Sequence, residues 1–71
     1  MEKNVGKTIA DNIRAERNRM NMTQEQVSKK LGITKRTYIK YEEDASKVSS
    51  STLADLSEMF NCDIKCFFIN L

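Results

Sequence analysis

The chain has 71 residues and a net charge of +2, and its composition is that of a globular protein, with 39% hydrophobic and 31% charged residues. Because this is about half the length at which a second domain is expected, we predict a single domain over residues 1–71, near the lower size limit for one core. We therefore expect neither a separate effector-binding domain nor a small-molecule effector, and the length speaks against most stand-alone enzymes.

The charge is divided unequally along the chain. Residues 1–41 contain ten Lys and Arg against four acidic residues, a net of +6, whereas residues 42–71 carry a net of −4. A basic half attracts a polyanion, although most charge imbalances do no more than solvate a surface.

The residue types favour helices. There is no Pro and there are only two Gly, so tight hairpin turns are scarce, while Lys, Glu, Met, Leu and Gln are common. No apolar run approaches the roughly 18 residues of a membrane span, and no signal-peptide core follows the first residues. We expect an all-α protein of the cytoplasm.

The chemistry-bearing residues form no catalytic or metal-binding constellation. Without His there is no Ser-His or Cys-His nucleophile, and the acidic run Glu42 to Asp44 has no partner base or phosphate loop. Cys62 and Cys66 are too few for a disulfide framework, and a zinc ion would need four thiolates from two chains of a dimer. We expect reduced thiols, no metal, no cofactor and no enzymatic activity.

A first helix is predicted over residues 7–20, because apolar residues recur there at helical spacing. They are Val5, Ile9, Ile13 and Met20. Asn21 follows, and asparagine tolerates the left-handed conformation in which helices commonly end.

Two short helices with a tight turn between them come next. Thr23 and Gln26 form a Thr-x-x-Gln capping box, which predicts a helix start with Val27 and Leu31 facing inward. Gly32 is suited to the positive φ that follows a helix. A buried Ile33 and a new N-cap at Thr34 then lead into a helix from Lys35 to Glu42, with Tyr38 and Tyr41 on one side. Two helices joined in this way are typical of a helix-turn-helix.

The last third of the chain repeats this pattern. Ser49 or Ser50 caps a helix that ends at Asn61, and Asp63 caps a final helical turn. The apolar residues of this part are Leu53, Leu56, Phe60, Ile64 and Phe67. The sequence therefore predicts a compact bundle of about five short helices.

The motifs resemble those of the lambdoid phage repressor and Cro family, the XRE-type helix-turn-helix regulators, over about residues 9–68. The matching segments are Ile13-Arg14-x-x-Arg17, Met22-Thr23-Gln24-x-x-Val27-Ser28-x-x-Leu31-Gly32-Ile33-Thr34, Tyr38-x-x-Tyr41-Glu42 and Thr52-Leu53-x-x-Leu56. Four features of these segments occur together: the Thr23-Gln24 start, a small residue at Ser28, Gly32 four positions later and Glu42 ten beyond that. This combination is far more specific than any one of them.

This resemblance implies that the second helix of the motif enters the DNA major groove. The residues expected to contact bases are Lys35, Arg36 and Lys40, and basic side chains favour guanine. The residues expected to contact the DNA backbone, or backbone and bases together, are Gln24, Thr34 and Thr37. The plainer interpretation of the helix residues is a solvated surface.

The resemblance also implies a partly buried ion pair between Arg17 and Glu42 that belongs to the architecture. Several residues depart from the family pattern, among them Asp44 and Val48 in the loop after the second motif helix, where many relatives have Gly and then Pro. Tyr38 stands where Ile or Val is usual, so either the helix packing is wider or the phenol reaches a polar partner. Ile39 stands at a usually polar, outward position. It contacts a thymine methyl or is a tolerated exposed residue, and from the sequence we favour the second.

The apolar C-terminus has two interpretations. Phe68, Ile69 and Leu71 form a symmetric dimer patch, or they fold back with Val5 to complete the core of the monomer.

We therefore expect a sequence-specific double-stranded DNA-binding regulator, a repressor by family habit, acting as a homodimer on an inverted repeat. The alternative from another class is an antitoxin-like or coactivator-like interaction module in which the acidic half or the Phe-rich tail binds a protein. A weaker alternative is a nonspecific nucleoid or RNA binder.

Overall fold

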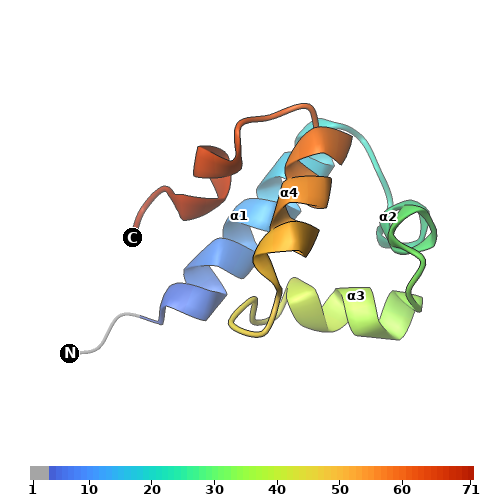
Figure 1. The fold of residues 1–71 in the computed structure, drawn as a ribbon, viewed down its shortest axis with the longest axis horizontal. Coiled ribbons are helices and arrows are strands. Elements are labelled where there is room, and N and C mark those ends of the chain that lie inside the picture. Colours follow the sequence, from blue (N-terminus) through green and yellow to red (C-terminus); the bar gives the residue numbers. More distant parts are fainter. Residues whose placement is uncertain (1–3) are drawn as a thin grey trace.

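The computed structural model describes residues 4–71. Within that range the chain forms four α-helices and one short 3-10 helix, with no strand (Figure 1). The elements are α1 (Val5–Arg19), α2 (Gln24–Leu31), α3 (Lys35–Tyr41), α4 (Ser50–Met59) and η1 (Ile64–Phe68). The all-α prediction is confirmed. The count of five helices is wrong in one respect, because the fifth element is a 3-10 helix rather than an α-helix.

The first helix begins two residues earlier than the sequence indicated. The Asn4 side chain accepts a hydrogen bond from the Lys7 backbone N–H at 3.0 Å and so caps α1. Val5 was expected on the inward face, but it lies in the first turn and remains 46% exposed. The inward face is instead carried by Ile9 and Ile13.

The predicted caps of the helix-turn-helix are confirmed. The Gln26 backbone N–H donates to Thr23 Oγ1 at 3.0 Å, and Gln26 Oε1 accepts from the Thr23 N–H at 2.8 Å. Gly32 adopts φ 74° after α2, and Thr34 accepts from the Thr37 N–H at the start of α3. Ile33 between them is only partly buried against the core, rather than fully buried as expected.

The C-terminal caps also agree with the sequence pattern. Ser49, not Ser50, caps α4 by accepting from the Thr52 N–H at 3.2 Å. Asn61 has φ 51° just beyond this helix, and Asp63 Oδ1 accepts from the Lys65 N–H at 2.9 Å at the start of η1.

All five elements contribute to one core, which also takes in the loop before α4. Its buried apolar residues are Ile9, Ala10, Ile13, Val27, Tyr38, Ala45, Leu53, Leu56, Phe60 and Phe67. The Tyr38 ring has no exposed surface and meets Tyr41 edge-on at a centroid distance of 6.3 Å. Phe60 and Phe67 form a second edge-on pair at 6.4 Å. The core is thus built around aromatic side chains from α3, from the residue that follows α4 and from η1.

A close contact joins the start of α1 to the loop that follows α3. The Ala45 N–H donates to the Gly6 carbonyl oxygen at 2.9 Å. A Cβ atom at Gly6 would collide with Asp44 Oδ1 and lie 3.0 Å from the Ser46 backbone nitrogen. The loop can approach the helix this closely because residue 6 has no side chain.

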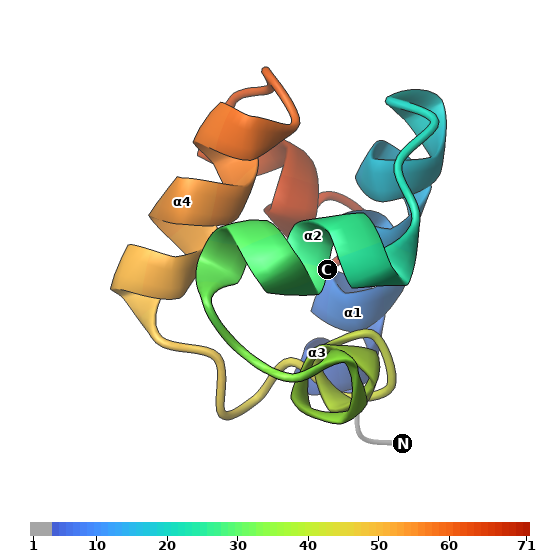
Figure 2. The ribbon, with the colours of Figure 1, turned by 90° about the vertical axis from the view of Figure 1, so that its right-hand side faces the viewer.

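The C-terminal segment is fastened to α1 by a buried asparagine. Asn12 Nδ2 donates to the carbonyl oxygens of Phe67 at 2.9 Å and of Ile69 at 2.8 Å. In both views the segment lies beyond α1 and α4 on the side away from α2 (Figures 1 and 2).

Beyond Phe67, the apolar side chains at the end of the chain are exposed. Phe68, Ile69 and Leu71 are 41%, 53% and 40% exposed, and Val5 is exposed as well. The interpretation in which these four side chains complete the monomer core is therefore wrong, because the segment docks through its backbone and through the buried Phe67 ring instead.

Candidate nucleic-acid interface

Helices α2 and α3 run crosswise. Figure 2 shows α2 lengthwise, with α3 nearly end-on below it. The buried face of α3 is held by Tyr38 in the core and by Glu42 at its end, so the opposite face looks into solvent.

That outward face of α3 is basic and carries no structural bonds. Lys35, Arg36 and Lys40 are exposed, and none of them forms an ion pair or side-chain hydrogen bond within residues 4–71. Together with Ile39 and Glu43 they surround a shallow hollow. The structure thus gathers the three expected base-contacting residues on one surface.

The two threonines of α3 are engaged with each other. Thr34 Oγ1 accepts from the Thr37 N–H at 3.1 Å and donates to Thr37 Oγ1 at 3.0 Å. Thr34 therefore acts first as the helix cap, and the hydroxyl hydrogen of Thr37 is the one left to donate to an external acceptor.

A second hollow, of about 510 Å³, lies at the start of α2. It is lined by Arg17, Met22, Thr23, Gln24, Glu25, Gln26, Lys29 and Lys35. Backbone N–H groups and the positive end of a helix dipole meet here, which suits an anion such as phosphate. Lys35 borders both hollows and so connects them.

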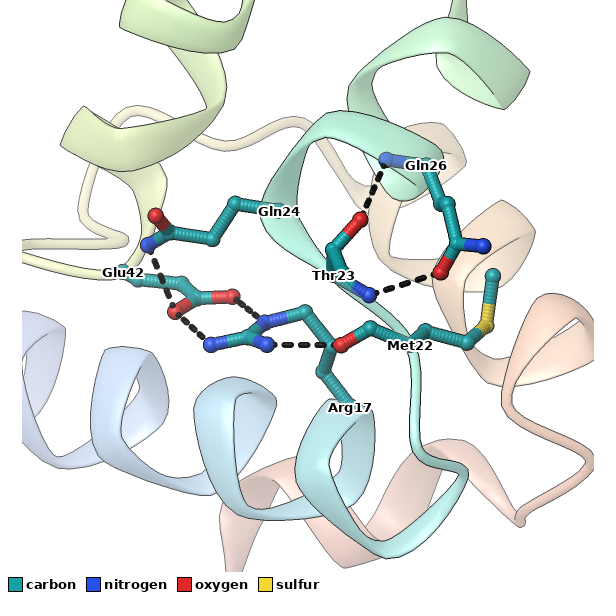
Figure 3. Close-up of polar contacts among 6 residues, drawn as sticks. All are labelled: Arg17, Met22, Thr23, Gln24, Gln26 and Glu42. Atoms are coloured by element: carbon teal, nitrogen blue, oxygen red, sulfur yellow. Dashed lines mark hydrogen bonds and ion pairs between the residues drawn. The ribbon is translucent and has the colours of Figure 1, made fainter.

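The amide of Gln24 does not point freely into this hollow. Its Nε2 atom donates to Glu42 Oε1 at 3.2 Å, as Figure 3 shows. No local sequence pattern predicts this contact, because Glu42 lies 18 positions further along the chain. A phosphate at the start of α2 would meet the backbone N–H groups first, and the Gln24 side chain would reach it only by giving up Glu42.

Arg17 and Glu42 form a buried ion pair across α1 and the end of α3 (Figure 3). Arg17 Nε donates to Glu42 Oε2 at 2.6 Å and Nη2 donates to Oε1 at 3.0 Å, while Nη1 donates to the Met22 carbonyl at 2.7 Å. The two side chains are 11% and 2% exposed. Burial by itself would raise the pKa of Glu42, but the hydrogen bonds and charge of Arg17 together with the polar groups of its other neighbours outweigh burial and hold that pKa below its ordinary value.

The Tyr38 phenol is the polar group that this arrangement leaves unsatisfied. Its hydroxyl is buried and has no hydrogen-bond partner within the described residues. Burial, with the Glu42 charge nearby, raises the pKa of Tyr38 far above its ordinary value, so the phenol stays neutral. The sequence predicts either wider helix packing or a polar partner for this phenol. No polar partner is found within the described residues.

The remaining cations divide into paired and unpaired groups. Arg14 contacts Asp11 at 2.7 Å, and Arg19 contacts Glu16 at 2.8 Å while also donating to the Phe60 carbonyl. Lys30 and Lys47 are exposed and enter no ion pair among residues 4–71. Arg19 thereby ties α1 to the end of α4 and serves the fold.

The described residues contain no cluster of three or more His, Cys, Asp or Glu side chains that could hold a metal ion. Cys62 and Cys66 are free thiols, and burial raises the pKa of Cys62 to about 11. Within residues 4–71, none of the helices has both the length and the apolar character needed to cross a membrane.

Comparison with known proteins agrees with this geometry. A family model described as helix-turn-helix matches residues 13–65. Two relatives, from Sinorhizobium medicae (strain WSM419) and Rhizobium meliloti (strain 1021), are each named as an uncharacterized HTH-type transcriptional regulator. Each is 33% identical over 60 residues, which cover 84% of this chain and 43% of the relative.

The chain thus spans less than half the length of these relatives. No solved structure shows a significant match. The family match covers α2, α3 and the turn between them, together with the ion pair that supports them. The chain belongs to the XRE-type helix-turn-helix family.

Proposed function

We propose that the protein is a sequence-specific double-stranded DNA-binding transcriptional regulator, acting as a repressor, that inserts α3 into the major groove. The observation that carries this proposal is the exposed, unpaired set of Lys35, Arg36 and Lys40 on the outward face of α3. Side chains that hold no structural bond are available to a ligand, and three cations on one helix face fit an anionic groove.

The chemistry of these side chains points to guanine. Arg36 can donate two parallel hydrogen bonds to guanine O6 and N7, and lysine donates to the same acceptors. The start of α2 would bind the phosphate backbone through its N–H groups, which fixes the position of α3 without selecting a sequence. Operators with G·C pairs at the contacted positions are therefore expected.

The protein acts as a homodimer on an inverted repeat, and its second copy docks on the patch formed by Phe68, Ile69 and Leu71. The three side chains are exposed while the backbone beneath them is fixed by Asn12, so the patch needs no ordering before it binds. The C-terminal segment that carries the patch lies on the side of α1 away from α2 (Figure 1), so the patch stays accessible when the helix-turn-helix is on DNA. A symmetric pair then presents two copies of α3 to two half-sites.

The proposal is tested by selecting binders from a random duplex library and measuring affinity for the selected and a scrambled duplex at two salt concentrations. We expect a preference of about a thousandfold or more for an inverted repeat, with a salt slope that counts the contacted phosphates. The triple variant Lys35→Ala, Arg36→Ala, Lys40→Ala should lose this preference while it still folds. Lys30→Ala, an exposed lysine of α2 outside the α3 face, is the matched control and should retain it.

A protein-interaction module is the second candidate, and the exposed patch favours it. In that case the triple variant would keep its function and no duplex would be enriched. Weak, steeply salt-dependent binding to every duplex would instead indicate a nonspecific binder.

A further inference from the structure

One side chain on the outward face of α3 is neither charged nor part of the core. Ile39 is partly buried, yet it does not pack against the hydrophobic core, in contrast to Ile33 and Tyr41 nearby. It therefore contributes little to the stability of the fold.

Ile39 occupies the middle of the basic face. Lys35 precedes it by four positions and Arg36 by three, which places both on the same side of the helix, and Lys40 is adjacent. These residues, with Glu43, surround the hollow in which Ile39 lies. If the cations enter the major groove, the isoleucine enters with them.

The chemistry of its side chain directs Ile39 to a base edge rather than to the DNA backbone. An aliphatic group can neither donate a hydrogen bond to a phosphate nor balance its charge, and the surrounding cations Lys35, Arg36 and Lys40 are the groups suited to that. In the major groove the one apolar group on a base edge is the methyl at C5 of a pyrimidine, carried by thymine. An isoleucine flanked by hydrogen-bond donors matches that methyl and offers nothing to the polar edges.

We infer that Ile39 is a specificity-determining residue that contacts the C5 methyl of a thymine in the operator, next to the pairs contacted by Lys35, Arg36 and Lys40. This inference rests on the proposed DNA-binding function and adds to it an apolar component of recognition. It reverses the sequence-based preference for a tolerated exposed residue.

The test removes the methyl group alone. Each thymine of one half-site of the selected duplex is replaced in turn by deoxyuridine, and affinity is measured by fluorescence anisotropy for the wild type, Ile39→Ala and Ile39→Val. At one position the wild type should lose about fourfold in affinity, the effect of one buried methyl group. At that position Ile39→Ala should bind the thymine and deoxyuridine duplexes equally well. Ile39→Val keeps a branched side chain, so deoxyuridine should weaken its binding nearly as much as it weakens binding by the wild type.

Several results would overturn the inference while leaving the proposed function intact. One is a selected operator that has no thymine in the contacted half-site. Another is that no deoxyuridine substitution weakens binding by the wild type. A third is that deoxyuridine lowers the affinity of Ile39→Ala as much as that of the wild type. Failure to select any duplex would count against the proposed function itself. Because Ile39 lies outside the core, both variants should fold, which an unchanged thermal midpoint verifies.

The same methyl group also occurs in 5-methylcytosine. Duplexes with cytosine or 5-methylcytosine at the responsive position separate the two sources. If 5-methylcytosine raises the affinity of the wild type but not that of Ile39→Ala, Ile39 contacts the methyl group on either base. If methylation does not raise the affinity of the wild type, the contact is restricted to thymine.

Discussion

At the scale of single residues, Glu42 at the end of α3 joins Arg17 of α1 to Gln24 of α2. It accepts two hydrogen bonds from Arg17 and one from Gln24 while almost fully buried. Glu42→Gln would leave the Arg17 guanidinium in a buried site without its counter-charge. We expect this variant to lose about 3 kcal/mol in the free energy of unfolding at pH 7, measured by urea titration.

The same pair predicts a pH dependence. Because the pKa of Glu42 is lower in the folded than in the unfolded chain, its stabilising effect is complete above the ordinary carboxyl pKa and is lost as pH falls through the lowered value. The stability difference between wild type and Glu42→Gln should therefore shrink below about pH 4. A difference that stays constant from pH 7 to pH 3 would contradict this account.

Tyr38 differs from Glu42, because its buried polar atom makes no hydrogen bond among the described residues that a mutation could remove. Its hydroxyl is buried without a hydrogen-bond partner in the described chain, so Tyr38→Phe removes a desolvated group and keeps the ring. We expect thermal denaturation to show unchanged or higher stability, by up to about 1 kcal/mol. Tyr41→Phe, at a half-buried ring, is the control. A clear loss in Tyr38→Phe alone would reveal a bond to this hydroxyl.

At the scale of elements, Gly6 sets two effects against each other. Alanine is the better helix former by about 0.5–1 kcal/mol, but its Cβ would collide with the loop after α3. The Asp44 side chain can move away, but the Ser46 backbone nitrogen would lie at 3.0 Å, which is tighter than an ordinary contact. We therefore expect crowding to dominate and Gly6→Ala to destabilise the protein by about 1–3 kcal/mol. Lys7→Ala, at an exposed position in the same turn, is the control; it loses only a surface ion pair with Asp11, and equal losses in the two variants would refute the contact.

The elements also show what sequence can and cannot predict. Caps depend on residues within a few positions, so Thr23, Gly32 and Thr34 were identified from local pattern. The contacts of Gly6 and Asn12 join segments about 40 and 55 positions apart, and no periodic pattern in the sequence predicts such contacts. For the site, the exposed cations follow from helix periodicity, whereas the engagement of Gln24 with Glu42 depends on the packing of α2 against the end of α3.

The whole molecule is asymmetric, with the basic α3 on one surface and the apolar C-terminal patch on another. If the patch formed by Phe68, Ile69 and Leu71 holds the dimer together, Ile69→Lys should shift the sedimentation behaviour to monomer at every tested concentration. Its helical content and thermal midpoint should stay unchanged, because residue 69 is 53% exposed. Ala15→Lys, exposed on α1, is the control, and a monomeric wild type would exclude this patch as the dimer interface.

The bonds that hold α3 in place all lie on its inner side and at its ends, through Tyr38, the Arg17–Glu42 pair and the Thr34 cap. Within residues 4–71 the outward residues contribute none. Mutations there should consequently be nearly silent for folding. If the protein selects its operator through this face as proposed, a lineage carrying the domain can acquire a new operator through successive single changes, without passing through unstable intermediates.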